Sequence, residues 1–153
     1  LVFSTLHTND APSAITRLID MGVKPFLVAS SIQAIMAQRL LRLICKGCKA
    51  IDPDPDPHYL RLLNIKPEDI KEHPIYKGKG CPICQGTGYK GRTGIFEVLE
   101  FTTELKATIT DRTDMAEVYA VAKADGMVTL RELAIQKLME GQTTFKEIVS
   151  VTG

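Results

Sequence analysis

The spacing of apolar positions predicts short strands and helices over the first third of the chain. An apolar run at residues 1–6 predicts a short buried strand, and the pattern at residues 39–44 is typical of a second strand. Between them, apolar positions at helical spacing predict a helix over about residues 12–21, which Gly22 is expected to end. A second helix is expected to begin at Pro25. Its apolar face would consist of Phe26, Ala29, Ile32 and Met36.

The middle of the chain, residues 45–92, is rich in proline and glycine and contains all four cysteines. Repeated Asp-Pro pairs at residues 52–57 predict an extended linker, because proline excludes an internal helix. Short helices are expected at residues 58–63 and from Pro67, and a strand is expected at residues 94–100. The remaining pattern predicts helices at about residues 103–110, 114–125, 129–140 and 144–151.

This order of segments predicts an α/β fold class and three parts. Residues 1–44 form an α/β piece, residues 45–92 a cysteine-bearing insert, and residues 93–153 a strand followed by a helical C-terminal tail. The chain does not begin with methionine, and its apolar opening at residues 1–3 has no polar residues before it. We therefore expect the chain to be a piece of a larger protein.

Composition excludes several classes of protein. The 153 residues are 44% hydrophobic and 24% charged, with 19 basic and 18 acidic side chains and a formal charge of +1. This balance argues against a dedicated nucleic-acid binder and against a disordered chain. The longest uncharged stretch, residues 25–38, is shorter than the roughly 20 residues of a membrane-spanning helix, so no membrane insertion is expected. The N-terminus also lacks the features of a signal peptide.

The cysteines form two Cys-x-x-Cys pairs, Cys45 with Cys48 and Cys81 with Cys84. Each such turn places two sulfurs on one side of a metal ion, and two turns complete a tetrahedral four-thiolate site. Because no coordination position stays open, such a site is structural. The spacing therefore predicts one structural Zn²⁺ per chain.

Other readings of the cysteines are less favoured. Disulfides are disfavoured in a chain without a secretion signal, and a thioredoxin-like motif needs only one exposed Cys-x-x-Cys. Iron is the closest competitor, because residues 81–84 resemble a rubredoxin knuckle, but the chain has no Trp and only 6% aromatic residues. Residues 81–88 also resemble a zinc repeat of Hsp40-type chaperones, a likeness that residues 45–50 do not share.

A dinucleotide-binding fingerprint is matched by sequence alone at residues 86–91, Gly-Thr-Gly-Tyr-Lys-Gly. The fingerprint requires a strand before it and a helix after it. Here a cysteine knuckle precedes the glycines and a strand is expected to follow. Turn glycines near a metal site are the better interpretation.

A strand end followed by hydroxyls, an imidazole and an amide stands at residues 4–9, Ser-Thr-Leu-His-Thr-Asn. In open α/β sheets ligands gather at the carboxyl ends of strands, so this is a natural place for a phosphate. A lone histidine before a helix is, however, more often a capping or packing residue. From the residues alone, both roles stay open for His7.

Taken together, these segments resemble the secretion ATPases of type II secretion and type IV pilus assembly (the GspE/PilB-like family) over essentially the whole chain. The matching motifs are Ser4–Asn9, Ala14–Leu18, Asp20–Val23, Gln38–Leu40 with Cys45 and Cys48, Lys79–Tyr89, and Gly91–Glu97. The resemblance implies that residues 1–44 are the C-terminal part of a RecA-like P-loop ATPase core. Residues 45–92 would be the family's tetracysteine zinc-binding element, and residues 93–153 a strand plus helical C-terminal subdomain.

The same resemblance implies a function for the parent protein. It would be a cytoplasmic homo-hexamer that hydrolyses ATP with Mg²⁺ and passes its movement to an inner-membrane platform protein and other machinery components, powering secretion or pilus assembly. Its association with the membrane would be peripheral, through partners. His7 would belong to the family's histidine box beside the terminal phosphates, with Thr5, Thr8 and Asn9 in the nucleotide vicinity. The shared motifs do not distinguish a secretion system from a pilus system.

The chain lacks several features of the family pattern, among them the Walker B carboxylates and the arginines of the family's N-terminal domain. It contains no G-x-x-x-x-G-K-[ST] phosphate loop, so we expect the chain alone to be inactive as an ATPase. Roles for Arg17, Arg39 and Arg92, which fall within matching motifs, stay undecided between ion pairing and function. The alternative hypothesis is a stand-alone zinc-knuckle module that binds other proteins and has no nucleotide chemistry.

Overall fold

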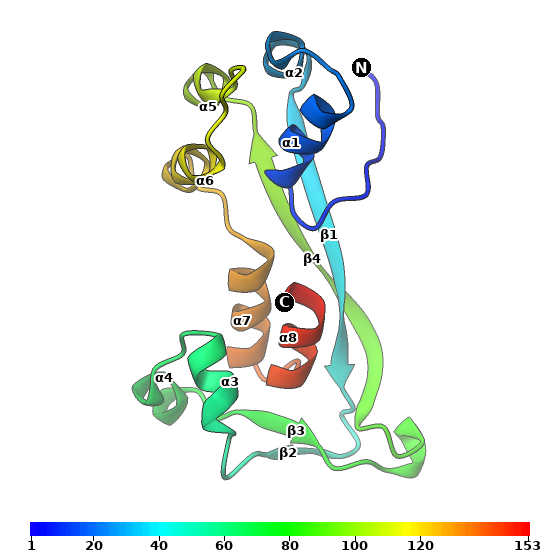
Figure 1. The fold of residues 1–153 in the computed structure, drawn as a ribbon. Coiled ribbons are helices and arrows are strands. Elements are labelled where there is room, and N and C mark those ends of the chain that lie inside the picture. Colours follow the sequence, from blue (N-terminus) through cyan, green and yellow to red (C-terminus); the bar gives the residue numbers. More distant parts are fainter. The chain divides into compact units, whose positions relative to one another are not determined.

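The computed structural model describes residues 1–153, apart from the side chain at position 67, as short helices and two pairs of strands (Figure 1). The first elements are α1 (Ser13–Asp20), α2 (Pro25–Ser31), β1 (Ala34–Ile44), β2 (Lys49–Ile51), α3 (Pro57–Leu62) and α4 (Pro67–Glu72). They are followed by β3 (Tyr76–Gly78), a 3-10 turn η1 (Pro82–Cys84) and β4 (Tyr89–Glu100). The chain ends with α5 (Thr103–Thr108), α6 (Met115–Ala124), α7 (Leu130–Met139) and α8 (Phe145–Thr152).

Strand β1 pairs with β4, and β2 pairs antiparallel with β3. The chain divides into two compact units, and the long strands β1 and β4 contribute residues to both. One unit comprises residues 1–38 and 96–129, and the other comprises residues 39–95 and 130–153. The three-part division expected from the sequence is based on the motifs in each segment, whereas these two units are defined by their compactness. The three-part division therefore stays a prediction.

The unit of residues 1–38 and 96–129 packs α1 and α2 with α5 and α6 around a small apolar core. Two of these helices begin at a side-chain cap, Thr102 for α5 and Asp114 for α6. Helix α1 has Pro12 at its N-cap position, and the Asp10 side chain accepts the N–H of Ser13, the first residue of the helix. The largest fully buried side chains of this core are Ile15, Val28, Leu99, Leu105 and Val118.

The unit of residues 39–95 and 130–153 packs α8 against α7 and α3. The ring of Tyr59, on α3, stacks on that of Phe145, the first residue of α8, with 6.1 Å between centroids. The fully buried side chains Leu41, Ile75, Leu138 and Ile148 form the core. The main chain of β1 is tied to this packing, because the Ile44 N–H donates to the Gln142 carbonyl at 2.8 Å.

Two expectations about the N-terminal third are wrong. Residues 1–6 form no strand, and Leu1 is fully exposed instead of buried. A strand exists only where a second strand pairs with its main chain, and none of the described residues does so here. Helix α2 ends at Ser31, so Met36 belongs to β1, which begins five residues earlier than the pattern indicated. Short apolar runs do not separate helix from strand.

The remaining element predictions are confirmed to within a few residues, except that β4 starts at Tyr89 and that β2 and β3 are absent from the sequence-based expectation. Strand β4 begins at Tyr89, within residues 86–91, where the dinucleotide fingerprint would require the start of a helix, so the interpretation of these glycines as turn residues is confirmed. Among the residues described, none of the helices has both the length and the apolar character needed to cross a bilayer.

Candidate metal centre

The pairing of β2 with β3 brings the two cysteine turns together. Cys48 directly precedes β2, and β3 ends shortly before Cys81. In the antiparallel ladder Lys49 pairs with Gly78 and Ile51 with Tyr76, so both turns lie at the same end of the ladder. The Lys79 N–H donates to the Cys48 carbonyl at 3.1 Å and extends this pairing toward the cysteines.

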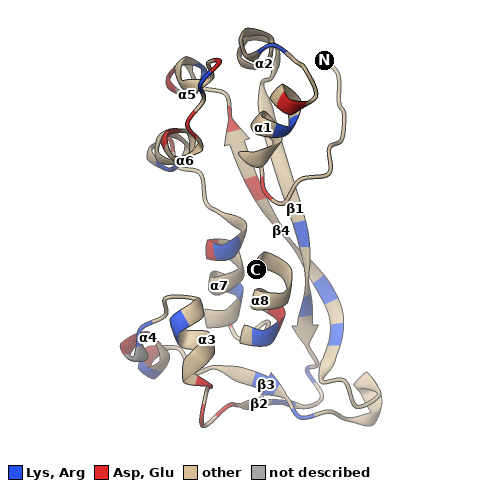
Figure 2. Ribbon diagram, viewed as in Figure 1, with Lys and Arg blue, Asp and Glu red and all other residues tan. Residues whose placement is uncertain are grey.

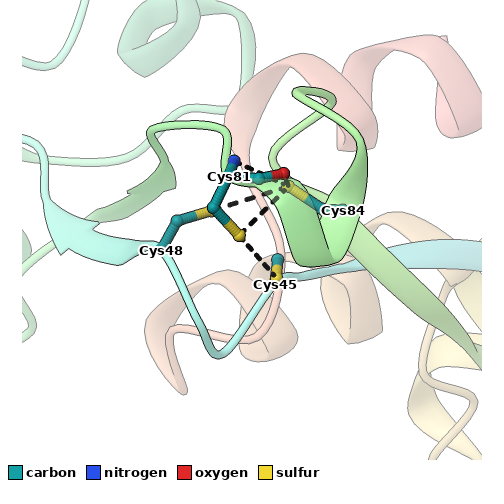
Figure 3. Close-up of side chains that lie close together, drawn as sticks. All are labelled: Cys45, Cys48, Cys81 and Cys84. Carbon is teal, nitrogen blue, oxygen red and sulfur yellow. Dashed lines mark hydrogen bonds between the residues drawn. The ribbon is translucent and has the colours of Figure 1, made fainter.

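All four thiols point toward one another (Figure 3). The sulfurs are 3.9 Å apart for Cys45 and Cys81, 3.8 Å for Cys48 and Cys84, and 3.7 Å for Cys81 and Cys84, and all four lie within 4.8 Å of one another. Disulfide sulfurs stand about 2.05 Å apart, so the thiols are not oxidised in pairs. Sulfurs about 2.3 Å from a common ion in a tetrahedron stand about 3.8 Å from one another. The cluster therefore has the dimensions of a four-thiolate metal site.

Backbone N–H groups prepare the sulfur of Cys84 for a negative charge. Burial raises the pKa of the Cys84 thiol, but the N–H groups of Cys81 and Gly88 donate to its sulfur at 3.2 and 3.3 Å. These bonds, with those from the thiols of Cys81 and Cys48, outweigh burial and lower the pKa of Cys84 to about 6. At neutral pH this cysteine is a ready thiolate ligand.

The pKa of the Cys48 thiol moves in the opposite direction. Burial raises it to about 11, and the neighbouring sulfurs of Cys84 and Cys81 contribute in the same sense. Thiolates crowded together repel one another, so a second charge in the cluster is costly until a cation neutralises it. A cluster with this charge balance is suited to a divalent metal ion.

Gly78 and Gly88 allow the two turns to approach closely. A Cβ added to Gly78 would overlap the main chain of Gly88, and one added to Gly88, whose φ is +78°, would lie 2.7 Å from the Gly78 oxygen. Gly88 also joins the turns through hydrogen bonds, because its carbonyl accepts the Cys45 N–H at 2.9 Å while its own N–H reaches Cys84. Only glycine fits both positions.

Basic residues, blue on the ribbon in Figure 2, lie on the strands that lead to the cluster. Four thiolates with one divalent cation carry a charge of −2, which such residues would offset. Two of these lysines contact residues other than the cysteines. Lys77 pairs with Asp52 at 2.8 Å, and the Lys49 ammonium lies 4.1 Å from the centroid of the Tyr76 ring. These contacts hold β2 and β3 together.

The second predicted group, Thr5, His7, Thr8 and Asn9, lies in the other unit, in the extended segment before α1. His7 and Thr5 are exposed. Thr8 and Asn9 border a shallow depression that is also lined by Ser13, Thr16, Arg17, Asp20, Met115 and Tyr119. The structure therefore places Arg17 beside two of the predicted residues, Thr8 and Asn9.

Arg92 lies in the unit that holds the cysteines, where its charge helps to lower the pKa of the buried Glu147. Sequence reasoning assigned no role to Glu97 and Tyr119, which contact the start of α1. A signal for Glu97 exists in the sequence. It occupies the inward-facing register of β4 between Ile95 and Leu99, where a charged residue is out of place.

Comparison with known proteins identifies the family to which the chain is related. A model of the family described as type II/IV secretion system protein matches residues 1–150. The type IV pilus assembly ATPase PilB of Thermus thermophilus is 43% identical over 152 residues, and that of Myxococcus xanthus is 41% identical. Type II secretion system protein E of Pseudomonas aeruginosa is 39% identical over 153 residues.

In each case the alignment covers 99% of the present chain. The chain spans much less of these relatives: 17% of the Thermus protein, 27% of the Myxococcus protein and 30% of the Pseudomonas protein. The matched residues 1–150 include the four clustered cysteines and the segment around His7. The chain belongs to the type II/IV secretion system protein family.

Proposed function

We propose that this chain is the C-terminal region of a RecA-like P-loop ATPase that powers type II protein secretion or type IV pilus assembly. The observation that carries the proposal is the family match over residues 1–150, together with relatives near 40% identity that are named pilus assembly ATPases or secretion system protein E. Such an ATPase would act as a homo-hexameric ring at the cytoplasmic face of the inner membrane.

The proposal divides the work between this chain and the rest of its parent. The chain has no phosphate loop of its own, so ATP and Mg²⁺ would be bound mainly by residues outside it. An exposed imidazole at His7, with hydroxyls at Thr5 and Thr8 and the amide of Asn9, would face the terminal phosphates. These groups donate hydrogen bonds, and an imidazole also accepts or releases a proton near neutral pH.

The four thiols would hold Zn²⁺ with a structural role. Cys45, Cys48, Cys81 and Cys84 supply four soft ligands at tetrahedral spacing, which is the donor set that zinc prefers in proteins. Bound zinc would cross-link the two turns and fix the β2–β3 ladder. With every coordination position taken by a thiolate, it would supply no catalysis. The zinc would keep the two cysteine turns and the β2–β3 ladder rigid. A rigid element of this kind could pass the movement of the ATPase to an inner-membrane platform protein and other machinery components.

The experiment compares the 153-residue chain with the full protein from which it comes. Steady-state phosphate release is measured for both with ATP and Mg²⁺, and a His7→Ala variant of each serves as control. The proposal expects turnover by the full protein and none above background by the chain. A full protein that binds no nucleotide and releases no phosphate contradicts the proposal and leaves a zinc-knuckle interaction module.

A further inference from the structure

Glu97 is a carboxylate buried within the apolar side of β4. It is 2% exposed and lies between Ile95 and Leu99, which are equally buried. Its Oε1 accepts the backbone N–H of Ala11 at 2.7 Å, a contact that joins residues 86 positions apart in the sequence. Both residues belong to the same compact unit.

Burying this carboxylate costs stability that an apolar side chain would not cost. A charged group removed from water is tolerated only when hydrogen bonds replace its solvation, and an apolar residue of similar size is often neutral or better. Glu97 therefore serves something other than packing. One of its partners is the main chain of Ala11, the second residue after Asn9.

Tyr119 makes a second contact with the same turn. Its hydroxyl is hydrogen-bonded to Asp10 and Ser13. Burial raises the pKa of the Tyr119 hydroxyl well above its ordinary value, and the hydrogen bond and charge of Asp10 add to this effect, so the group stays a donor at physiological pH. Tyr119 is on α6, so the turn is contacted from two elements that lie far along the chain.

The turn itself is closely connected to the segment before it. Asp10 accepts the Ser13 N–H at 2.8 Å, and its carbonyl accepts the Thr8 hydroxyl at 3.0 Å. Any displacement of residues 10–13 therefore moves Thr8 and the residues beside it. His7 is exposed and directly precedes Thr8.

We infer that Glu97 and Tyr119 are positioning residues for the segment His7–Asn9. They fix residues 10–13 from β4 and α6, and the orientation of the preceding imidazole follows from that turn. This inference rests on the proposed function for its use in ATP hydrolysis, but the anchoring of the turn is testable without nucleotide.

The first test measures hydrogen–deuterium exchange in the full protein, on peptides that cover residues 7–14. Glu97→Leu removes the acceptor and keeps the volume, Glu97→Gln keeps an acceptor oxygen, and Glu100→Leu changes an exposed position on the same strand. We expect exchange at residues 7–14 to rise about tenfold in Glu97→Leu and to stay within about threefold of wild type in the other two. Tyr119→Phe should raise exchange in the same peptides. Unchanged exchange in Glu97→Leu, or an equal rise in peptides from α5, overturns the inference.

The second test measures kcat and KM for ATP in the same variants. A misplaced catalytic group lowers kcat more than it weakens substrate binding. Glu97→Leu should therefore lower kcat about tenfold with KM within about twofold, and Glu97→Gln should restore most of the rate. If His7→Ala lowers turnover but Glu97→Leu does not, the positioning role is overturned. If His7→Ala has no effect, the proposed role of His7 fails, whereas the anchoring of the turn is judged from the exchange data.

Discussion

Arg42, on β1, holds the buried carboxylate of Glu147, on α8, with both its main chain and its side chain. The Arg42 N–H donates to Oε1 at 2.9 Å, Nε donates to Oε2 at 2.7 Å, and Nη2 lies 2.6 Å from Oε2. The guanidinium also lies 4.3 Å from the centroid of the Tyr89 ring, whose hydroxyl shares a hydrogen bond with Thr144 at 2.6 Å. The start of α8 is thus held against β1 and β4, the strands that lie directly before Cys45 and shortly after Cys84.

Removing the cation of this pair should destabilise the protein more than removing the charge of its carboxylate. Arg42→Met leaves the Glu147 carboxylate, 4% exposed, without its cation and should cost about 2–3 kcal/mol of unfolding free energy. This is below the fully buried case because the Arg42 side chain is 46% exposed. Glu147→Gln should cost less, since the guanidinium left behind is partly solvated. Denaturant unfolding measures both, and Lys137→Met, which breaks a more exposed pair with Glu140, should change stability by less than about 1 kcal/mol.

Stability should fall in acid through the same pair. Burial raises the pKa of Glu147, but the hydrogen bonds and charge of Arg42 outweigh it, so the pKa lies below its ordinary 4.5. A carboxylate with a depressed pKa in the folded state contributes stability that is present above about pH 4.5 and is lost as pH falls through the folded pKa. Unfolding free energies measured from pH 7 to pH 3 should converge for wild type and Glu147→Gln at the acidic end. A constant difference over this range would contradict the assignment.

The elements that could be predicted from the sequence depend on local chemistry. Gly22, Gly126 and Gly141 adopt positive φ just after helices where the sequence predicted helix ends, because few other residues adopt that conformation. The Cys-x-x-Cys turns were also recognisable, because each is a complete local signal. Their meeting in one cluster needed only the assumption that both bind the same ion.

The features that could not be predicted depend on contacts between distant residues. Strands β2 and β3 are three residues each, too short to show alternation, and exist only because they pair with one another. The contacts of Glu97 with Ala11 and of Arg42 with Glu147 join residues 86 and 105 positions apart. Sequence patterns are recognised over short windows, and no short window contains both residues of either pair.

The close approach at Gly88 predicts a difference between two glycines with the same backbone conformation. Gly86 and Gly88 both have φ of +78°, but an added Cβ meets nothing within 4 Å at Gly86 and meets the Gly78 main chain at Gly88. Gly86→Ala should therefore cost only the conformational penalty, about 1–2 kcal/mol. Gly88→Ala should cost more and should also weaken metal binding, because it displaces the N–H that reaches Cys84. Thermal unfolding and a competitive zinc titration measure the two effects, and equal effects of the two variants would contradict the close approach.

His7 should matter for turnover and hardly at all for folding. The side chain is exposed, so His7→Ala should change the free energy of unfolding by less than about 0.5 kcal/mol. In the full protein the same variant should lower ATP turnover about 100-fold, the scale of a lost acid–base or phosphate-contacting group. His58→Ala, an exposed histidine on α3, serves as the matched control and should leave turnover unchanged. Turnover within about twofold of wild type for His7→Ala would leave His7 as a residue without a role in hydrolysis.

The metal should be zinc, one ion per chain, and it should organise the cysteine turns without organising the whole protein. The two turns are joined by a small number of main-chain hydrogen bonds, such as that from the Cys45 N–H to the Gly88 carbonyl, so an ion bound by the four thiolates would be the main cross-link between them. Chelation or Cys81→Ser should raise hydrogen exchange at residues 45–52 and 76–88, whereas α1, α5 and α6, in the other compact unit, should keep their protection. Elemental analysis of the purified protein, with exchange before and after chelation, decides the matter. Iron in place of zinc, or turns that keep their protection without metal, would show that another interaction holds this part of the molecule together.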